Sequence, residues 1–217
     1  MGVLIDNFDL LWGAFLTTLG ITVVAGVLSF VWGVVLAAFR VSPVAPLRTF
    51  SAAYVTIFRN TPLTLLFVFL GSAAPPLFGI VLPLGVITAI VAMSLYTSTF
   101  VCEAVRSGIN SVGVGQAEAA RSVGLTFIQT LGTVVLPQAF RSVVPPLINV
   151  YVAHIKNTSV AAGFATTELT AIGTRLANGN PGDVIGVFMG VGVAYLVMTL
   201  PLSISAEKLE SKVAVAR

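Results

Sequence analysis

The side chains that most often carry out chemistry in proteins are few in this sequence, and they stand far apart. Cys102 and His154 are each the single residue of their type, so neither an intrachain disulfide nor a Cys/His metal site is expected. No lysine stands in a Gly-x-x-x-x-Gly-Lys-Ser/Thr pattern, so the sequence offers no P-loop for ATP. The apolar segments hold no pair of carboxylates. The sequence therefore predicts no catalytic residue, and no metal or cofactor bound by this chain.

Two cationic side chains inside apolar segments point instead to the passage of a polar solute. Arg59 follows about ten residues of an apolar segment, roughly 15 Å along a helix that rises 1.5 Å per residue. A charge at that depth costs about 2.5–3.5 kcal/mol, so it should face protein or a water-filled path. Lys156 marks a second polar cluster. The predicted substrate path comprises Arg59, Asn60, Thr61, Thr64, Lys156, Asn157, Thr158 and Ser159.

A structural role is the alternative for both cations. Arg59 could pair with helix-end carbonyls or with a partner subunit, and Lys156 is equally compatible with either role. His154 has no second ligand at metal spacing, so we interpret it as a hydrogen-bonded core histidine. Glu103 and Arg106 stand three residues apart on a helix and predict a local ion pair.

The composition places these groups in a membrane protein. The chain has 217 residues, of which 57% are hydrophobic and 9% charged, and its mean hydropathy is +1.02. Soluble domains carry about 25% charged residues, so an all-α polytopic membrane protein is predicted. The net charge of +3 comes from scattered basic residues, so no nucleic-acid partner is expected.

Hydropathy and the distribution of basic residues predict five transmembrane helices in a single domain over 1–217. Clusters of Gly and Pro divide the long uncharged stretch after Asn60, and a less apolar region with Pro145 and Pro146 is needed to complete the count. With five spans the N-terminus lies outside, the C-terminus lies inside, and basic residues such as Arg40, Arg121 and Lys208 all face the cytoplasm. The spans are placed at about 10–39, 49–72, 83–104, 142–164 and 184–206.

The segment between the third and fourth spans, 107–137, differs in composition from its surroundings. Strong helix formers over 116–123 predict a short helix, and Gly124 suits the left-handed residue that ends it. Thr126 and Gln129 have the spacing of a capping box and predict the start of a second helix. A low, alanine-rich surface with charges at its edge allows another protein to approach closely, although a solvated connector is the alternative. The predicted docking residues are Gln116, Ala117, Glu118, Ala119, Ala120, Arg121 and Gly124.

The spacing in this segment resembles the cytoplasmic loop of permeases in ATP-binding-cassette (ABC) importers. Glu118-Ala-Ala, Gly124, Val134 and Leu136-Pro137 match that motif, with Val134 where isoleucine is usual. The resemblance extends to the polar amino-acid uptake family. Phe58-Arg-Asn-Thr-Pro-Leu63 and Lys156-Asn-Thr-Ser159 match its signatures, with Asn60 in place of Gly and Asn157 in place of Asp. Segments such as Arg40-Val-Ser-Pro-Val44 and Leu95-Tyr-Thr-Ser98 are most similar to actinobacterial glutamate-uptake permeases.

The resemblance implies a transport subunit in a bacterial cytoplasmic (plasma) membrane that works by alternating access. It implies a cytoplasmic ABC ATPase dimer that carries ATP and Mg, a second permease chain (identical or related) and an extracytoplasmic amino-acid-binding protein. Glutamate is the favoured substrate, and glutamine or another polar amino acid stays open. An autonomous secondary transporter and a membrane-embedded enzyme are the alternatives. The first is disfavoured because no internal repeat is visible, and the second because reactive side chains are scarce.

Overall fold

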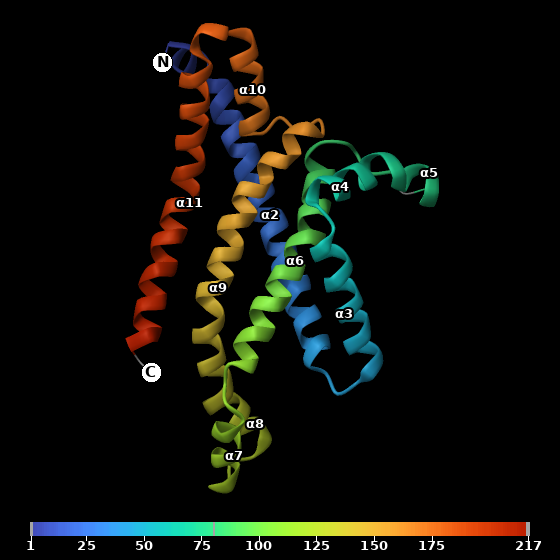
Figure 1. Ribbon diagram of the computed structural model, residues 1–217, viewed down its shortest axis with the longest axis vertical. Helices are drawn as coiled ribbons and strands as arrows, with labels where there is room; N and C mark the ends of the chain where they lie inside the picture. The colour runs from blue at the N-terminus through green and yellow to red at the C-terminus, as the bar shows by residue number, and fades with distance from the viewer. Residues whose placement is uncertain (1, 80, 216–217) are drawn as a thin grey trace.

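The computed structural model describes residues 2–79 and 81–215, and it places them in an elongated bundle of helices with no strand among them (Figure 1). Arg217, part of the basic C-terminal end, lies outside these residues, and the side chain of Lys212 is not described. The α-helices are α1 (Gly2–Asp6), α2 (Phe8–Val41), α3 (Ala45–Asn60), α4 (Leu63–Val68), α5 (Ala74–Phe78), α6 (Val86–Asn110), α7 (Val114–Ser122), α8 (Phe127–Thr130), α9 (Leu136–Asn157), α10 (Leu169–Gly179) and α11 (Val184–Val215).

Short segments of other helix types complete the fold. Phe69–Ala73 and Leu131–Val135 are π-helical turns, and Thr158–Gly163 and Pro181–Asp183 are 3₁₀ turns. The π turn at 131–135 joins α8 directly to α9, so the chain is helical from Ile128 to Gly163. The fourth predicted span, 142–164, therefore belongs to a longer helix that already begins within the predicted loop.

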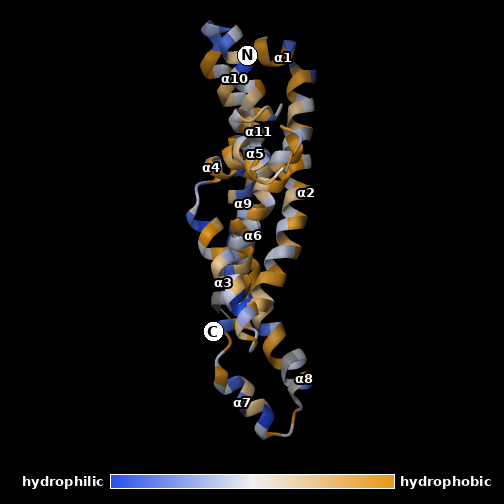
Figure 2. Ribbon diagram, turned by 90° about the vertical axis from the view of Figure 1, so that its right-hand side faces the viewer, coloured by the Kyte–Doolittle hydropathy of each residue, from blue (hydrophilic) through white to orange (hydrophobic). Residues whose placement is uncertain are grey.

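Within the described part of the chain, four helical stretches are long and apolar enough to cross a membrane: Phe8–Val41, Val86–Asn110, Ile128–Gly163 and Pro181–Leu209. A fifth crossing is available if the bent pair Ala45–Asn60 and Leu63–Phe78 counts as one span. Figure 2 shows apolar colour along most of the length of α2. The predicted all-α, polytopic membrane fold is confirmed.

The second predicted span, 49–72, is not one continuous helix. The chain breaks at Thr61 and Pro62, and the helices on either side meet at 102°. Both residues adopt extended backbone, with ψ of 129° and 135°. Proline lacks a backbone N–H and disfavours helical geometry in the residue before it, so the helix ends at Asn60 instead of bending through Pro62.

Helices α2 and α6 pack side by side at the centre of the bundle, with α9 beside both. Small buried residues on α2, including Ala25, Gly26, Ser29 and Gly33, allow the backbones to approach closely. A Cβ atom added at Gly33 would lie 2.5 Å from the Cβ atom of Val101 on α6. The central crossing therefore depends on the absence of a side chain at this position.

The two ends of the bundle differ in what they carry. Figure 1 places the N-terminus and α10 at one end, and it places α7, α8 and the turn between α2 and α3 toward the other. The C-terminal part of α11 runs toward the end that carries α7. The segment over α7 and α8 projects beyond the long helices, as Figure 2 also shows.

Candidate functional site

The projecting segment begins with α7, whose termination is set by local backbone chemistry. Gly124 has a φ of +93°, a conformation that side chains with a Cβ disfavour. Its N–H donates to the carbonyl of Arg121 at 3.0 Å, and the N–H of Leu125 donates to the carbonyl of Ala120 at 3.2 Å. These two bonds form a Schellman motif, which satisfies carbonyls at the end of the helix. The predicted helix and its glycine stop are both present, although α7 begins two residues earlier than expected, at Val114.

The second helix of the segment begins with the predicted capping box. The N–H of Thr126 donates to Oε1 of Gln129 at 3.0 Å, and the N–H of Gln129 donates to Oγ1 of Thr126 at 3.3 Å. Both amide groups would otherwise lack partners at a helix start. The capping box fixes the point from which the long helix through α8 and α9 begins.

Most of the predicted docking residues are accessible on this segment. Gln116, Glu118, Ala119, Arg121 and Gly124 are exposed, and Ala117 is half-buried. Ala120 is buried instead, and it anchors the inner face of α7.

The segment also exposes large apolar side chains that the sequence argument missed. Val114, Val123 and Ile128 are 73%, 79% and 80% exposed; the first two lie at the ends of α7 and the third lies on α8. An exposed apolar patch on a polar segment is typical of a protein–protein interface. The sequence does carry a signal for them: these large apolar residues flank a short helix whose other residues are polar or have small side chains.

A cleft of about 590 Å³ lies between α6 and α9, inside the spanning part of the bundle. Its lining is mainly apolar but includes the polar side chains of Thr97, Asn149, His154 and Asn157, and we call it the polar cleft for these groups. Thr97 on α6 and His154 on α9 face each other at its inner wall, with 2.8 Å between Oγ1 and Nδ1. His154 Nε2 lies 3.2 Å from the carbonyl oxygen of Thr22. A carbonyl only accepts, so Nε2 donates there and Nδ1 accepts from the threonine hydroxyl. The lining residues are Tyr96, Thr97, Phe100, Pro146, Asn149, Val150, Ala153, His154 and Asn157.

The expectation that His154 is a hydrogen-bonded core residue is confirmed, because its side chain is 1% exposed and both ring nitrogens have partners. His154 links α9 to α6 and α2 at the wall of the cleft. Tyr96 and Asn149 line the same cleft and were not predicted. Finding them requires knowing which face of α6 packs against α9.

The eight predicted path residues do not form one site. Asn157 lines the polar cleft, and the guanidinium carbon of Arg59 lies 5.6 Å from the centre of the Phe100 ring at the cleft wall. Asn60 and Thr61 bond to backbone carbonyls one turn earlier on α3. Thr158 is buried, Ser159 bonds to the carbonyl of Lys156, and Thr64 and Lys156 are exposed away from the cleft lining.

Arg59 does not lie in the middle of a straight span. It lies in the last turn of α3, next to the break at Thr61 and Pro62. The chain changes direction by 102° directly after it, and the predicted membrane depth of Arg59 stays a prediction. The side chain is exposed, with its charge over an aromatic face.

A buried carboxylate, Glu168, holds the opposite end of the bundle together. It is 0% exposed, and it accepts hydrogen bonds from the N–H of Ala171 at 2.7 Å and the hydroxyl of Tyr195 at 2.8 Å. Burial raises the pKa of Glu168 above its ordinary value, against these hydrogen bonds, which lower it. Thr18 accepts the N–H of Leu169 at 3.1 Å. Helices α2, α10 and α11 are thereby tied to one another.

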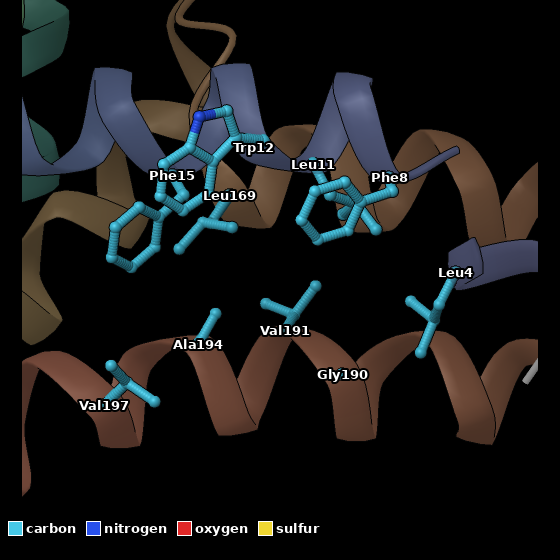
Figure 3. A pocket seen from close by; sticks show the side chains of 10 residues that line it. All are labelled: Leu4, Phe8, Leu11, Trp12, Phe15, Leu169, Gly190, Val191, Ala194 and Val197. Carbon is cyan, nitrogen blue, oxygen red and sulfur yellow. The ribbon is translucent and has the colours of Figure 1, made fainter. Parts of the chain in front are cut away.

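A second hollow lies between α2 and α11, close to the N-terminus, with a volume of about 320 Å³. Figure 3 shows Phe15, Leu11 and Leu169 facing Ala194 and Val191 across it. Its side chains are almost entirely apolar, so it offers a polar solute no partners for hydrogen bonding. The cleft between α6 and α9 is the better candidate for a polar substrate.

Comparison with known families decides what kind of protein carries these features. The family model of the binding-protein-dependent transport system inner membrane component matches residues 29–215. The chain belongs to this family. Membership makes it a multi-pass permease of the inner membrane, as predicted, and the family implies an ATPase partner and a second permease subunit.

The permease has relatives along nearly its whole length. It is 36% identical over 220 residues to the glutamate transport system permease protein GluC of Corynebacterium glutamicum, covering 94% of each chain. It is 39% identical over 212 residues to the probable glutamine ABC transporter permease protein GlnM of Bacillus subtilis, covering 98% of this chain and 97% of the relative. The resemblance to amino-acid uptake permeases is thus confirmed at the level of the family.

Solved structures show the same fold. The crystal structure of an amino acid ABC transporter with histidines superimposes with a TM-score of 0.87 over 96% of both chains, at 24% identity. An inward-facing structure of the MetNI methionine ABC transporter gives a TM-score of 0.74 over 96% of this chain and 98% of the other, also at 24% identity.

Proposed function

We propose that the permease forms the membrane path of an importer for a polar amino acid, with glutamate as the favoured substrate. The projecting segment with its exposed apolar residues carries this proposal, because the membrane part needs a place for the energy-supplying subunit to act. The relatives support the substrate class: their names give glutamate and glutamine. The separate ATPase holds ATP and Mg, and this permease holds neither.

The proposed orientation places α7 in the cytoplasm and the N-terminus outside. Arg40, Arg48 and Arg106 lie at the end of the bundle near α7, together with Arg121 on α7 itself. The opposite end carries Asp6, Asp9 and the buried Glu168. Cytoplasmic loops are enriched in arginine and lysine, so this arrangement favours the stated direction.

The proposed coupling runs along one helix. The ATPase dimer binds α7 and the start of α8. Its polar contacts lie around Ala117, Glu118, Ala119 and Arg121. Val123 and Ile128 add apolar contact area. Because the chain is helical from Ile128 to Gly163, a displacement of this segment moves α9 as well. His154 and Asn157 lie on α9 at the cleft, so movement of α9 changes the shape of the cleft. The cleft therefore opens to one side of the membrane when the two ATPase subunits come together and to the other side when they separate.

The proposed substrate contacts lie in the polar cleft. Asn149 and Asn157 supply amide groups suited to a polar amino acid, and Tyr96 and Phe100 supply aromatic walls. Arg59, at the Phe100 side, attracts the substrate carboxylate toward the cleft. A second permease chain, identical or related, completes the path, and an extracytoplasmic binding protein delivers the substrate.

Reconstitution tests the function. The permease is incorporated into proteoliposomes with its ATPase and binding protein, and uptake of labelled glutamate, glutamine, aspartate and arginine is measured with and without ATP. We expect uptake to depend on ATP and to be fastest for labelled glutamate. Uptake that persists without the ATPase, driven by an ion gradient, would identify a secondary transporter instead. Uptake of arginine in preference to the acidic and amide substrates would contradict the substrate assignment.

A further inference from the structure

A third hollow, the arginine cleft, lies toward the end of the bundle that carries α7. It has a volume of about 510 Å³ and is formed by α2, α3 and α6 near the turn that joins α2 to α3 (Figure 1). Its lining is polar, unlike that of the hollow near the N-terminus, and it contains three guanidinium groups. The lining residues are Arg40, Val41, Arg48, Ala52, Arg106 and Asn110.

The arginine cleft holds more positive charge than its neighbours neutralise. Glu103 is the carboxylate paired with it: an oxygen lies 2.7 Å from Arg106 Nη2, and the other lies 4.0 Å from Arg40 Nη2. Arg48 donates to the backbone carbonyl of Ser42 at 3.0 Å, which carries no formal charge. Among the described side chains, three guanidinium groups therefore face one carboxylate, which leaves an excess of two positive charges.

Hydrogen bonding is also incomplete at this cluster. Arg40 Nη1 and Arg106 Nε are buried donors and Glu103 Oε1 is a buried acceptor, and none of the three has a hydrogen-bond partner among the residues that the structure describes. An unpaired buried donor on a charged group is costly. Negatively charged oxygens in the cleft would offset the charge excess and accept from the accessible parts of the Arg40 and Arg106 side chains, which are 24% and 35% exposed.

The surroundings of the cleft favour a lipid as the source of those oxygens. Val44, Leu47 and Phe50 follow the turn next to the cleft, and they are 49%, 36% and 50% exposed. Helices α2 and α6 belong to the candidate membrane spans, and both end at this level. Apolar side chains thus meet basic ones at the point where acyl chains meet phosphate groups in a bilayer.

We propose that the arginine cleft binds the headgroup of an anionic phospholipid. Guanidinium groups match the geometry of phosphate oxygens and bind them through paired N–H donors. Basic pockets between membrane helices are suited to anionic headgroups. The exposed apolar residues beside the cleft accommodate the acyl chains, which inorganic phosphate lacks.

Native mass spectrometry of the full chain tests the site. Delipidated protein in a neutral detergent is titrated with dioleoylphosphatidylglycerol and, separately, with zwitterionic dioleoylphosphatidylcholine. We expect the first phosphatidylglycerol molecule that binds to do so at least about fivefold more tightly than phosphatidylcholine. A preference of about fivefold is what the attraction between one arginine and an anionic headgroup gives. Inorganic phosphate at the same concentration should neither bind measurably nor displace the lipid.

Arg48 is the residue to replace, because it does not touch Glu103 and its loss leaves the ion pairs of that carboxylate in place. Arg48→Gln should remove most of the preference for phosphatidylglycerol. Arg141→Gln is the matched control, since Arg141 is exposed on α9 outside the cleft, and it should keep the preference. Ala52→Glu places a carboxylate in the cleft and should displace the lipid even if Arg48→Gln folds poorly.

Three outcomes would overturn the proposal. The first is equal binding of the two lipids by the unmodified chain. The second is an equal loss of the preference for phosphatidylglycerol in Arg48→Gln and Arg141→Gln. The third is retention of phosphatidylglycerol by both cleft variants while their complex with the ATPase weakens. That result would assign the arginine cleft to an acidic partner protein.

Discussion

Replacing the two exposed apolar residues beside α7 is the sharpest perturbation of the proposed ATPase contact. In the double variant Val123→Ser/Ile128→Ser, the removed side chains are 79% and 80% exposed in the permease alone. They contribute little to folding, so the thermal stability should change by no more than about 0.5 kcal/mol. In a complex the same side chains would be covered.

The magnitude follows from the area that becomes covered. Full burial of a valine or isoleucine side chain stabilises by about 1.5–3 kcal/mol. About four fifths of each side chain's area is available for burial here. Interfaces recover only part of the burial energy, so the double variant should lose about 1–2 kcal/mol of association free energy. That corresponds to roughly a 5- to 30-fold weaker association with the ATPase.

The assay is the concentration of ATPase subunit needed to half-saturate the reconstituted permease, read from ATP hydrolysis in proteoliposomes. Ser122→Ala is the control, because it alters an exposed neighbour whose hydroxyl bonds to the carbonyl of Ala119 without removing apolar surface. If the double variant and the control half-saturate at the same ATPase concentration, the two residues lie outside the interface and the reasoning is refuted.

Three further predictions follow from the geometry of the glycine stop, the cleft and the buried carboxylate. Gly124→Val forces a β-branched residue to a φ of +93°; we expect a cost of about 1–2 kcal/mol and a loss of coupled ATP hydrolysis, whereas Gly113→Val, in ordinary extended backbone, should retain activity. Asn157→Leu should raise the KM for substrate several-fold in uptake assays while the assembled complex stays intact; an unchanged KM would exclude Asn157 from the path. Burial raises the pKa of Glu168 above the ordinary value of 4.5, so the folded state holds the proton more firmly than the unfolded state. The stability that this protonation contributes is therefore lost as pH rises from 4.5 through the pKa of the folded state. Thermal melting across that range should fall more steeply for the unmodified chain than for Glu168→Gln, and parallel curves would contradict this.

Features set by local interactions could be predicted from the sequence. The bond between Thr126 and Gln129 spans three residues, and the stop at Gly124 depends on one backbone conformation and two nearby carbonyls. The long apolar stretches likewise needed only composition to predict them. Short-range hydrogen bonding and hydropathy are therefore enough to determine these parts of the fold.

Features set by tertiary packing could not be predicted in this way. Pro62 signalled a disturbance of the helix, but the 102° change of direction depends on what α4 packs against, so the predicted span 49–72 was drawn as one straight helix. The polar cleft exists because Thr97 and His154, 57 residues apart, face each other across α6 and α9. Glu168 is fully buried because Tyr195, 27 residues away on α11, packs against it and donates a hydrogen bond to it, and no local pattern shows that contact.

The central claim is that a separate ATPase drives this permease through α7, and a charge reversal on that helix tests it most directly. Glu118 is exposed and makes no hydrogen bond or ion pair among the described residues that would tie it to the fold. Glu118→Lys is compared with Glu207→Lys, an exposed glutamate on α11 with the same change of charge. Substrate-stimulated ATP hydrolysis and uptake are measured together in proteoliposomes. The account predicts that Glu118→Lys loses most of both while Glu207→Lys keeps both. Full stimulation and uptake in Glu118→Lys would contradict it.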